Sequence, residues 1–281
     1  MNDDEPDDNH IEVNTSQPVG AYAGFPPWVV IHVPHDSTVI PSGVRSQFLL
    51  TDKELQNELR LMTDHHTHDL FTVCSGAAAI VRSPVSRLVV DVERFADDAL
   101  EAMAARGMGS IYQVTSSLQP LRRSLSEKER RELLQAWYYP HHAHLENVVE
   151  FAVSRFGRCL VLDCHSFPSV PLPYEQRDLD LSRPDICIGT DSFHTNGALT
   201  QAFVDSFTDA GWSVAVNDPF SGALVPASRY QIDARLSAVM VEINRSVYVN
   251  EADANVHRNF SEIAARVGAC CLNAITRAFP V

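Results

Sequence analysis

Short apolar runs alternate along this chain with longer segments in which apolar residues recur at helical spacing. The runs are rich in β-branched residues and bounded by turn residues, which predicts buried strands. The predicted strands cover residues 28–33, 77–81, 87–92, 158–164, 185–189, 212–216 and 238–243. The predicted helices cover residues 51–73, 124–156, 194–210 and 252–278. Strands that alternate with helices predict an α/β fold with a mostly parallel sheet.

Capping residues mark where two of these helices begin. Thr51 or Asp52 can cap the first helix, and Ser124 or Ser126 can cap the second. The segment 166–184 is rich in proline and polar residues and is predicted to be a long loop, a feature that is often functional in a compact domain.

The distribution of charge along the chain limits the class of protein. Residues 1–20 are acidic with little that could pack, so they are predicted to be a disordered leader before a single α/β hydrolase domain over 21–281. A formal charge of -14 argues against a nucleic-acid partner, because phosphate binding needs a positive field.

Membrane insertion and secretion are not expected. No apolar run approaches the roughly 18 residues that would cross a bilayer, and no basic-then-apolar signal opens the chain. The six cysteines show no CxxC spacing, and a chain of 281 residues with so few cysteines does not need a disulfide framework. We therefore expect a cytoplasmic protein.

Polar residues cluster where the predicted strands end. Ligands of open α/β sheets bind outside the carboxyl ends of the strands, so these residues are the first candidates for a site. They are His35, Asp91, Glu93, Arg94, Asp163, His165, Asn217, Glu242 and Arg245.

Two histidines that directly follow buried strands predict a metal site. Neutral imidazole is a preferred ligand of zinc, and catalytic zinc takes three protein ligands, so one divalent ion, zinc first, is expected at His35 and His165. The segment 64–69 offers most candidates for the third ligand, namely Asp64, His66 and His68. Asp36, which directly follows His35, is a further candidate. Oxygen and nitrogen ligands also suit other divalent ions.

A carboxylate inside an apolar strand needs a partner or a function. Glu242 interrupts such a strand, and burying it is costly unless it is paired, protonated or bound to metal. It is predicted to be the general base, with an ion pair to Arg94 or Arg245 as the structural alternative. Both arginines are candidate clamps for a substrate carboxylate, because guanidinium binds carboxylate in a bidentate fork.

An ordered set of motifs resembles the N-formylglutamate amidohydrolase family. The set spans nearly the whole chain after residue 20, and its most specific members are the PH, DCHS and EINRSVYVNE motifs. The stretches are VPHDS (33–37), TDHHTHDLF (63–71), SRLVVDVER (86–94), YYPHHAHL (138–145), VLDCHS (161–166), RPDICIG (183–189), NDPFSG (217–222) and VEINRSVYVNE (241–251).

The resemblance implies a zinc-dependent hydrolase that removes the formyl group of a small anionic N-acyl amino acid such as N-formylglutamate. It also implies a three-layer α/β/α fold similar to carboxypeptidase-like zinc hydrolases. The implied roles are metal ligands for His35, Asp64 and His165, the general base for Glu242, and substrate binding for Arg94, Arg245, His142 and Asn217.

Two motifs depart from the family pattern, and the second departure concerns the substrate. The family usually has PHSG where this chain has Pro34-His35-Asp36-Ser37, and it has asparagine where this chain has Glu93. An acid beside Arg94 is expected to neutralise it and to weaken recognition of an anionic substrate.

Three alternatives stay open at this point. A metallopeptidase or another N-acyl deacylase would use the same scaffold, and a non-catalytic protein would bind metal or carboxylate without turnover. A hydrolase with Ser37, Ser166 or Cys164 as nucleophile is disfavoured because the chain has no G-x-S-x-G elbow.

Overall fold

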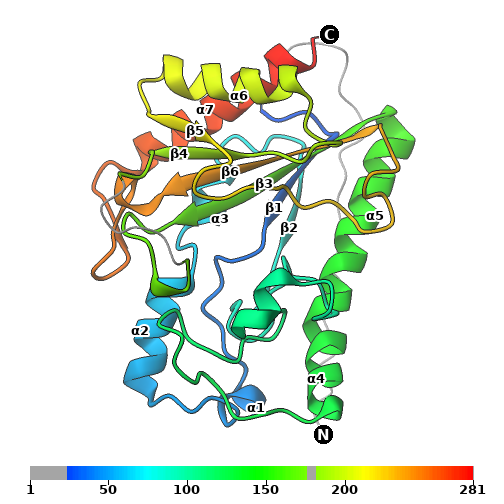
Figure 1. The fold of residues 1–281 in the computed structure, drawn as a ribbon. Coiled ribbons are helices and arrows are strands. Elements are labelled where there is room, and N and C mark those ends of the chain that lie inside the picture. Colours follow the sequence, from blue (N-terminus) through cyan, green and yellow to red (C-terminus); the bar gives the residue numbers. More distant parts are fainter. Residues whose placement is uncertain (1–23, 176–181, 281) are drawn as a thin grey trace, which may run out of the picture.

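A six-stranded sheet forms the centre of the molecule (Figure 1). The computed structural model describes residues 24–175 and 182–280. The strand order is β2-β1-β3-β6-β4-β5. The strands are β1 (Val29–Val33), β2 (Ala79–Arg82), β3 (Cys159–Phe167), β4 (Ile186–Gly189), β5 (Val214–Val216) and β6 (Leu236–Asn244), and a separate pair joins β7 (Val249–Asn250) and β8 (Asn255–Val256). All neighbours in the large sheet are parallel except β4 and β6, which confirms the predicted mostly parallel sheet.

Helices cover both faces of this sheet. The helices are α1 (Ser42–Arg45), α2 (Asp52–Met62), α3 (Thr67–Thr72), α4 (Glu127–Leu133), α5 (Tyr139–Phe156), α6 (Gly197–Asp209) and α7 (Phe260–Ala278). One apolar core joins a face of the sheet to α3, α6 and α7, and another joins the opposite face to α5. No described helix is long and apolar enough to span a membrane.

A third apolar core lies in a lobe built from α1, α2, α4 and the chain between β2 and α4. Figure 1 shows this lobe beyond the ends of the central strands. The apolar run at 87–92 belongs to it and is not the strand that its composition predicts. Turn hydrogen bonds from Val89 and Val90 to Ser86 close the backbone on itself, and the apolar side chains are buried between loops. Composition cannot separate such a buried run from a buried strand.

Two predicted helices are interrupted. The first, predicted over 51–73, ends at Met62 and restarts at Thr67, with His66 in the left-handed region at φ 60°. The second, predicted over 124–156, begins after Ser126 and contains a π-helical turn at Leu134–Tyr138 before α5. The other strand predictions and the helix predicted over 194–210 are confirmed with shifted ends. The helix predicted over 252–278 begins only at Phe260, because Asn255–Val256 form β8. The predicted leader at 1–20 lies outside the described residues.

Candidate active site

The register of three parallel strands brings four polar side chains together. Strands β1, β3 and β6 are neighbours, and their register places His32 beside Asp163 and His165 beside Glu242. Side chains two apart on a strand share a face, so Asp163 and His165 both lie on the face that α5 covers. The carboxyl ends of these strands therefore form a polar edge.

The break between α2 and α3 positions Asp64 at this edge. The Asp64 amide donates to the His35 carbonyl at 3.0 Å, which attaches the break to the end of β1. The Asp64 carboxylate accepts from Arg245 Nη2 at 3.0 Å and from the Ser166 amide at 3.2 Å. The position of Asp64 therefore depends on the interruption of the helix predicted over 51–73.

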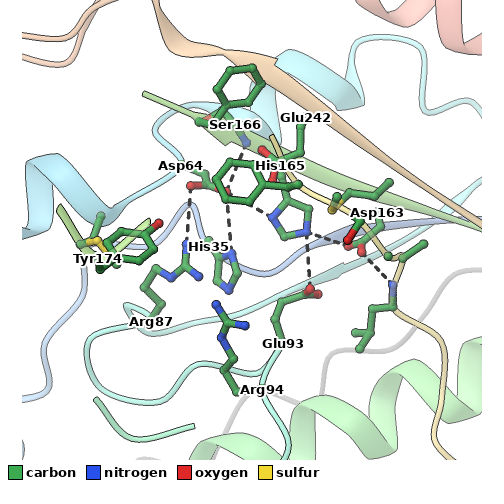
Figure 2. A pocket seen from close by; sticks show the side chains of 18 of the residues that line it. His35, Asp64, Arg87, Glu93, Arg94, Asp163, His165, Ser166, Tyr174 and Glu242 are labelled. Atoms are coloured by element: carbon green, nitrogen blue, oxygen red, sulfur yellow. Dashed lines mark hydrogen bonds and ion pairs between the residues drawn. The ribbon is translucent and has the colours of Figure 1, made fainter. Parts of the chain in front are cut away.

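His35, Asp64 and His165 form a buried group that fits a divalent metal ion. Asp64 Oδ2 lies 3.7 Å from His35 Nδ1 and 3.3 Å from His165 Nδ1. Donor atoms about 2.0–2.2 Å from one ion lie about 3.3–3.6 Å apart in a tetrahedral arrangement. His35 Nδ1 is buried and has no hydrogen-bond partner, as expected of a nitrogen that holds its lone pair for an ion. The dashed line from His35 to Asp64 in Figure 2 marks the 3.7 Å contact, which is longer than a hydrogen bond.

A carboxylate lies behind each of the two histidines. His35 donates from Nε2 to Asp91 Oδ1 at 2.8 Å, and His165 donates from Nε2 to Asp163 Oδ1 at 3.0 Å. Such carboxylate–histidine pairs fix the tautomer and the ring orientation of metal-ligating histidines. Burial raises the pKa of Asp91, but its interactions with His35 and Arg87 hold that pKa well below its usual range, so Asp91 is ionised.

Glu242 has an unsatisfied oxygen beside this group. Its Oε2 is buried without a hydrogen-bond partner, and burial, with the charge of Asp64, raises its pKa to about 8. The predicted structural alternative was an ion pair with Arg94 or Arg245. Neither arginine forms one with Glu242 within residues 24–175 and 182–280.

The pocket in front of these side chains has a volume of about 450 Å³, which suits a small molecule. Its lining carries charged side chains of both signs. The lining includes His35, Asp64, Arg87, Glu93, Arg94, Glu101, Asp163, His165, Glu242 and Arg245.

Three arginines of the pocket differ in how closely neighbouring acidic groups bind their guanidinium groups. Arg245 is committed to Asp64 and Ser166, and Arg87 donates from Nη2 to Asp91 Oδ2 at 2.9 Å. Arg94 is held more loosely, with Nε 3.8 Å from Asp91 Oδ2 and with no hydrogen-bond partner on that nitrogen. Arg94 therefore keeps the most capacity to bind an anion.

Glu93 does not neutralise Arg94, contrary to the expectation from their adjacency. Its oxygens lie 3.3 Å from His32 Nδ1 and 3.7 Å from His165 Nε2. Figure 2 shows the two side chains diverging, with Glu93 directed at His165 and Arg94 at His35.

Two predicted substrate-binding residues lie outside the pocket lining. His142 bonds through Nε2 to the Val92 carbonyl and packs against Tyr138. Asn217, at the end of β5, is engaged with the backbone and hydroxyl of Thr190. The sheet explains the second case, because β5 lies at its edge, separated by β4 and β6 from the strands that carry the histidines.

The other candidates for the third metal ligand have partners away from His35 and His165. His66 bonds to the Ala254 carbonyl, His68 pairs with Asp69, and Asp36 pairs with Arg82. Of the four candidates, only Asp64 joins His35 and His165.

Sequence reasoning missed His32 and Arg87. His32 is fully buried inside β1, and a histidine within an apolar strand was the same kind of signal that singled out Glu242. Arg87 carries no comparable signal, because the composition of its segment predicts a strand that does not form.

The geometry does not support a hydrolase with a serine or cysteine nucleophile. Cys164 is fully buried, and burial raises the pKa of its thiol well above the usual range. Ser37 donates to the Pro84 carbonyl, while Ser166 Oγ accepts from Arg245 Nε at 3.3 Å.

The protein has a layered α/β fold, and the ends of its central strands gather histidines, carboxylates and arginines around one pocket. The family model of N-formylglutamate amidohydrolases matches residues 28–249, and the chain belongs to that family. This confirms the family predicted from the motifs.

Two solved structures share the fold. The N-formylglutamate amidohydrolase of Ralstonia eutropha JMP134 is 22% identical, with a TM-score of 0.76 over 92% of this chain and 96% of that one. A gene product of Agrobacterium tumefaciens is 20% identical, with a TM-score of 0.65 over 91% of this chain and 92% of that one. Among curated proteins, none matches this sequence.

Proposed function

We propose that this protein is a metal-dependent amidohydrolase that cleaves the N-formyl group of a small anionic N-formyl amino acid, with N-formylglutamate as the first candidate. One observation carries the metal dependence: His35 presents a buried, unpartnered Nδ1 to a carboxylate and a second imidazole. The family name and the Ralstonia relative supply the substrate class.

His35, Asp64 and His165 would hold the ion, and zinc suits this donor set best. When bound, such an ion lowers the pKa of water and polarises a carbonyl oxygen. The buried carboxylates Asp91 and Asp163 would keep both imidazoles oriented for it.

Glu242 would act as the proton carrier. In its ionised form it removes a proton from the attacking water, and it then delivers that proton to the amide nitrogen as the C–N bond breaks. The products are formate and the free amino acid. Burial, together with the charge of Asp64, keeps the pKa of Glu242 far above that of an exposed glutamate. Glu242 is therefore a stronger base than an exposed glutamate.

Arg94 would bind a carboxylate of the substrate. Its Nε has no hydrogen-bond partner, and Asp91 and Glu101 hold the guanidinium at the pocket wall without saturating it. Arg245 supports the site differently, because its Nη2 neutralises the outer oxygen of Asp64.

Formate release from N-formylglutamate tests the proposal. Activity should vanish when the protein is stripped with a chelator and return on addition of Zn²⁺. Glu242→Gln should retain metal and lose turnover, whereas Ser166→Ala should remain chelator-sensitive and active.

A substrate panel separates the alternatives on the same scaffold. N-formylglutamate, N-acetylglutamate and a glutamyl dipeptide should be compared at equal concentration, with the formyl compound preferred. Preference for the acetyl compound or the dipeptide would replace the proposal by a deacylase or a peptidase. Full activity of the metal-free protein would overturn the metal dependence.

A further inference from the structure

A second group of metal-ligating side chains lies behind the first. His32, Glu93 and Asp163 each offer one donor atom, and these atoms all lie within 4.8 Å of one another. We propose that these three residues bind a second divalent cation, so that the pocket holds a two-metal centre. This goes beyond the proposed function, which needs only the ion at His35, Asp64 and His165.

The distances fit an ion. His32 Nδ1 lies 3.3 Å from Glu93 Oε1, within the about 3.3–3.6 Å that separates two ligands of one tetrahedral ion. His32 Nδ1 lies 2.8 Å from Asp163 Oδ1, which is a hydrogen bond that coordination would replace. One imidazole and two carboxylates are a common donor set for zinc and for other divalent ions.

Among the described residues, no arginine of the pocket pairs with the two carboxylates of this group. Asp163 is fully buried, and Glu93 Oε1 is a buried atom with no hydrogen-bond partner. Within ion-pair distance, the described chain offers these two carboxylates only histidines, since Arg87 and Arg94 pair with Asp91 and Glu101. Buried carboxylates are stable when they are paired or coordinate a metal.

The surroundings supply an outer shell and an entry path. The Leu224 amide donates to Asp163 Oδ2 at 2.9 Å, while Oδ1 faces both His32 and His165. His32 Nε2 lies 2.9 Å from His141 Nε2, so a neutral His32 that binds an ion through Nδ1 can donate from Nε2 to His141. Glu93 and Asp163 line the pocket, through which an ion can enter, while His32 closes the site from behind.

One imidazole connects the two groups. His165 faces Asp64 through Nδ1 and Asp163 through Nε2, so the first site ends where the second begins (Figure 2). Binding at the two sites is therefore expected to be coupled, because an ion at either one orders the same ring.

The number of ions per chain tests the proposal. The full-length protein is stripped with a chelator, titrated with Zn²⁺, desalted and analysed by inductively coupled plasma mass spectrometry. Two ions per chain are expected for the unaltered protein and one for Glu93→Gln. Glu101→Gln, an acid of the same pocket outside both groups, is the matched control and should keep two.

Spectroscopy of the Co²⁺-loaded protein gives a second readout that does not depend on activity. Two neighbouring high-spin Co²⁺ ions couple magnetically, which weakens their electron paramagnetic resonance signal. Glu93→Gln should give the full signal of a single uncoupled ion. His32→Gln removes the ligand on the opposite side and should have the same effect if Glu93→Gln alters thermal unfolding.

The two possible failures are distinguishable. One ion per chain in the unaltered protein, or two ions in Glu93→Gln, would overturn the second site. His35→Ala should remove one ion and leave the other. Two ions retained in His35→Ala would instead contradict the first site and the proposed function.

Discussion

The Nε2 atom of His35 donates to Asp91 Oδ1 at 2.8 Å, and this single hydrogen bond determines which ring nitrogen is free. An ionised carboxylate only accepts, so the proton lies on Nε2 and the lone pair on Nδ1. That nitrogen is buried and faces Asp64. Asp91 would thus leave His35 Nδ1 free to bind the proposed ion, without being a ligand itself.

Asp91→Asn should weaken metal binding at the first site by about 10- to 100-fold, the usual effect of removing a carboxylate behind a ligating histidine. The amide can present a donor to His35 and so favours the wrong tautomer. Competition with a chromogenic chelator measures the change. Glu58→Gln, another buried acid that lies outside the pocket lining, should leave the affinity unaltered, and equal affinities in both variants would contradict the role of Asp91.

The pH profile should show that Glu242 works in its ionised form. Burial raises its pKa from 4.5 to about 8, so the active form increases as pH rises through the pKa. A bound cation favours the ionised form and lowers the midpoint. We expect kcat/KM to rise with pH, with a midpoint between 4.5 and about 8. Glu242→Gln should be inactive at every pH, and substantial turnover by that variant would exclude Glu242 as the base.

Arg94→Met should reduce substrate affinity more than turnover. Losing a charge-assisted hydrogen bond of about 1.5–3 kcal/mol corresponds to a rise in KM of about 10- to 150-fold for N-formylglutamate. Steady-state kinetics measure the change. An N-formyl amino acid amide without free carboxylates is the control substrate and should show similar KM values with both proteins. An equal loss on both substrates would mean that Arg94 acts through the shape of the pocket.

Much of the site could be predicted because its residues follow or interrupt apolar strands. His35, His165 and Glu242 were found in this way, and their convergence follows from the adjacency of β1, β3 and β6. Only the family resemblance singles out Asp64, because its position depends on a helix break that periodicity does not reveal.

Long-range placement explains the other misses. Asn217 follows a strand just as His165 does, but β5 is at the edge of the sheet. Glu93 adjoins Arg94 in sequence, yet the two side chains diverge, which backbone adjacency cannot foretell. The run 87–92 has the composition of a strand but obtains its burial in a separate lobe.

The sequence offers two serines, Ser124 and Ser126, as the N-cap of α4, and the structure selects Ser126. The Ser126 side chain accepts from the Glu129 amide, and the Glu129 side chain accepts from the Ser126 amide, which completes a capping box. Ser126→Ala should therefore lower the free energy of unfolding by about 1 kcal/mol. Ser124→Ala is the matched control and should change it by less than about 0.5 kcal/mol, as for most surface substitutions. Urea denaturation followed by circular dichroism measures both, and equal effects of the two substitutions would show that the helix begins elsewhere in solution.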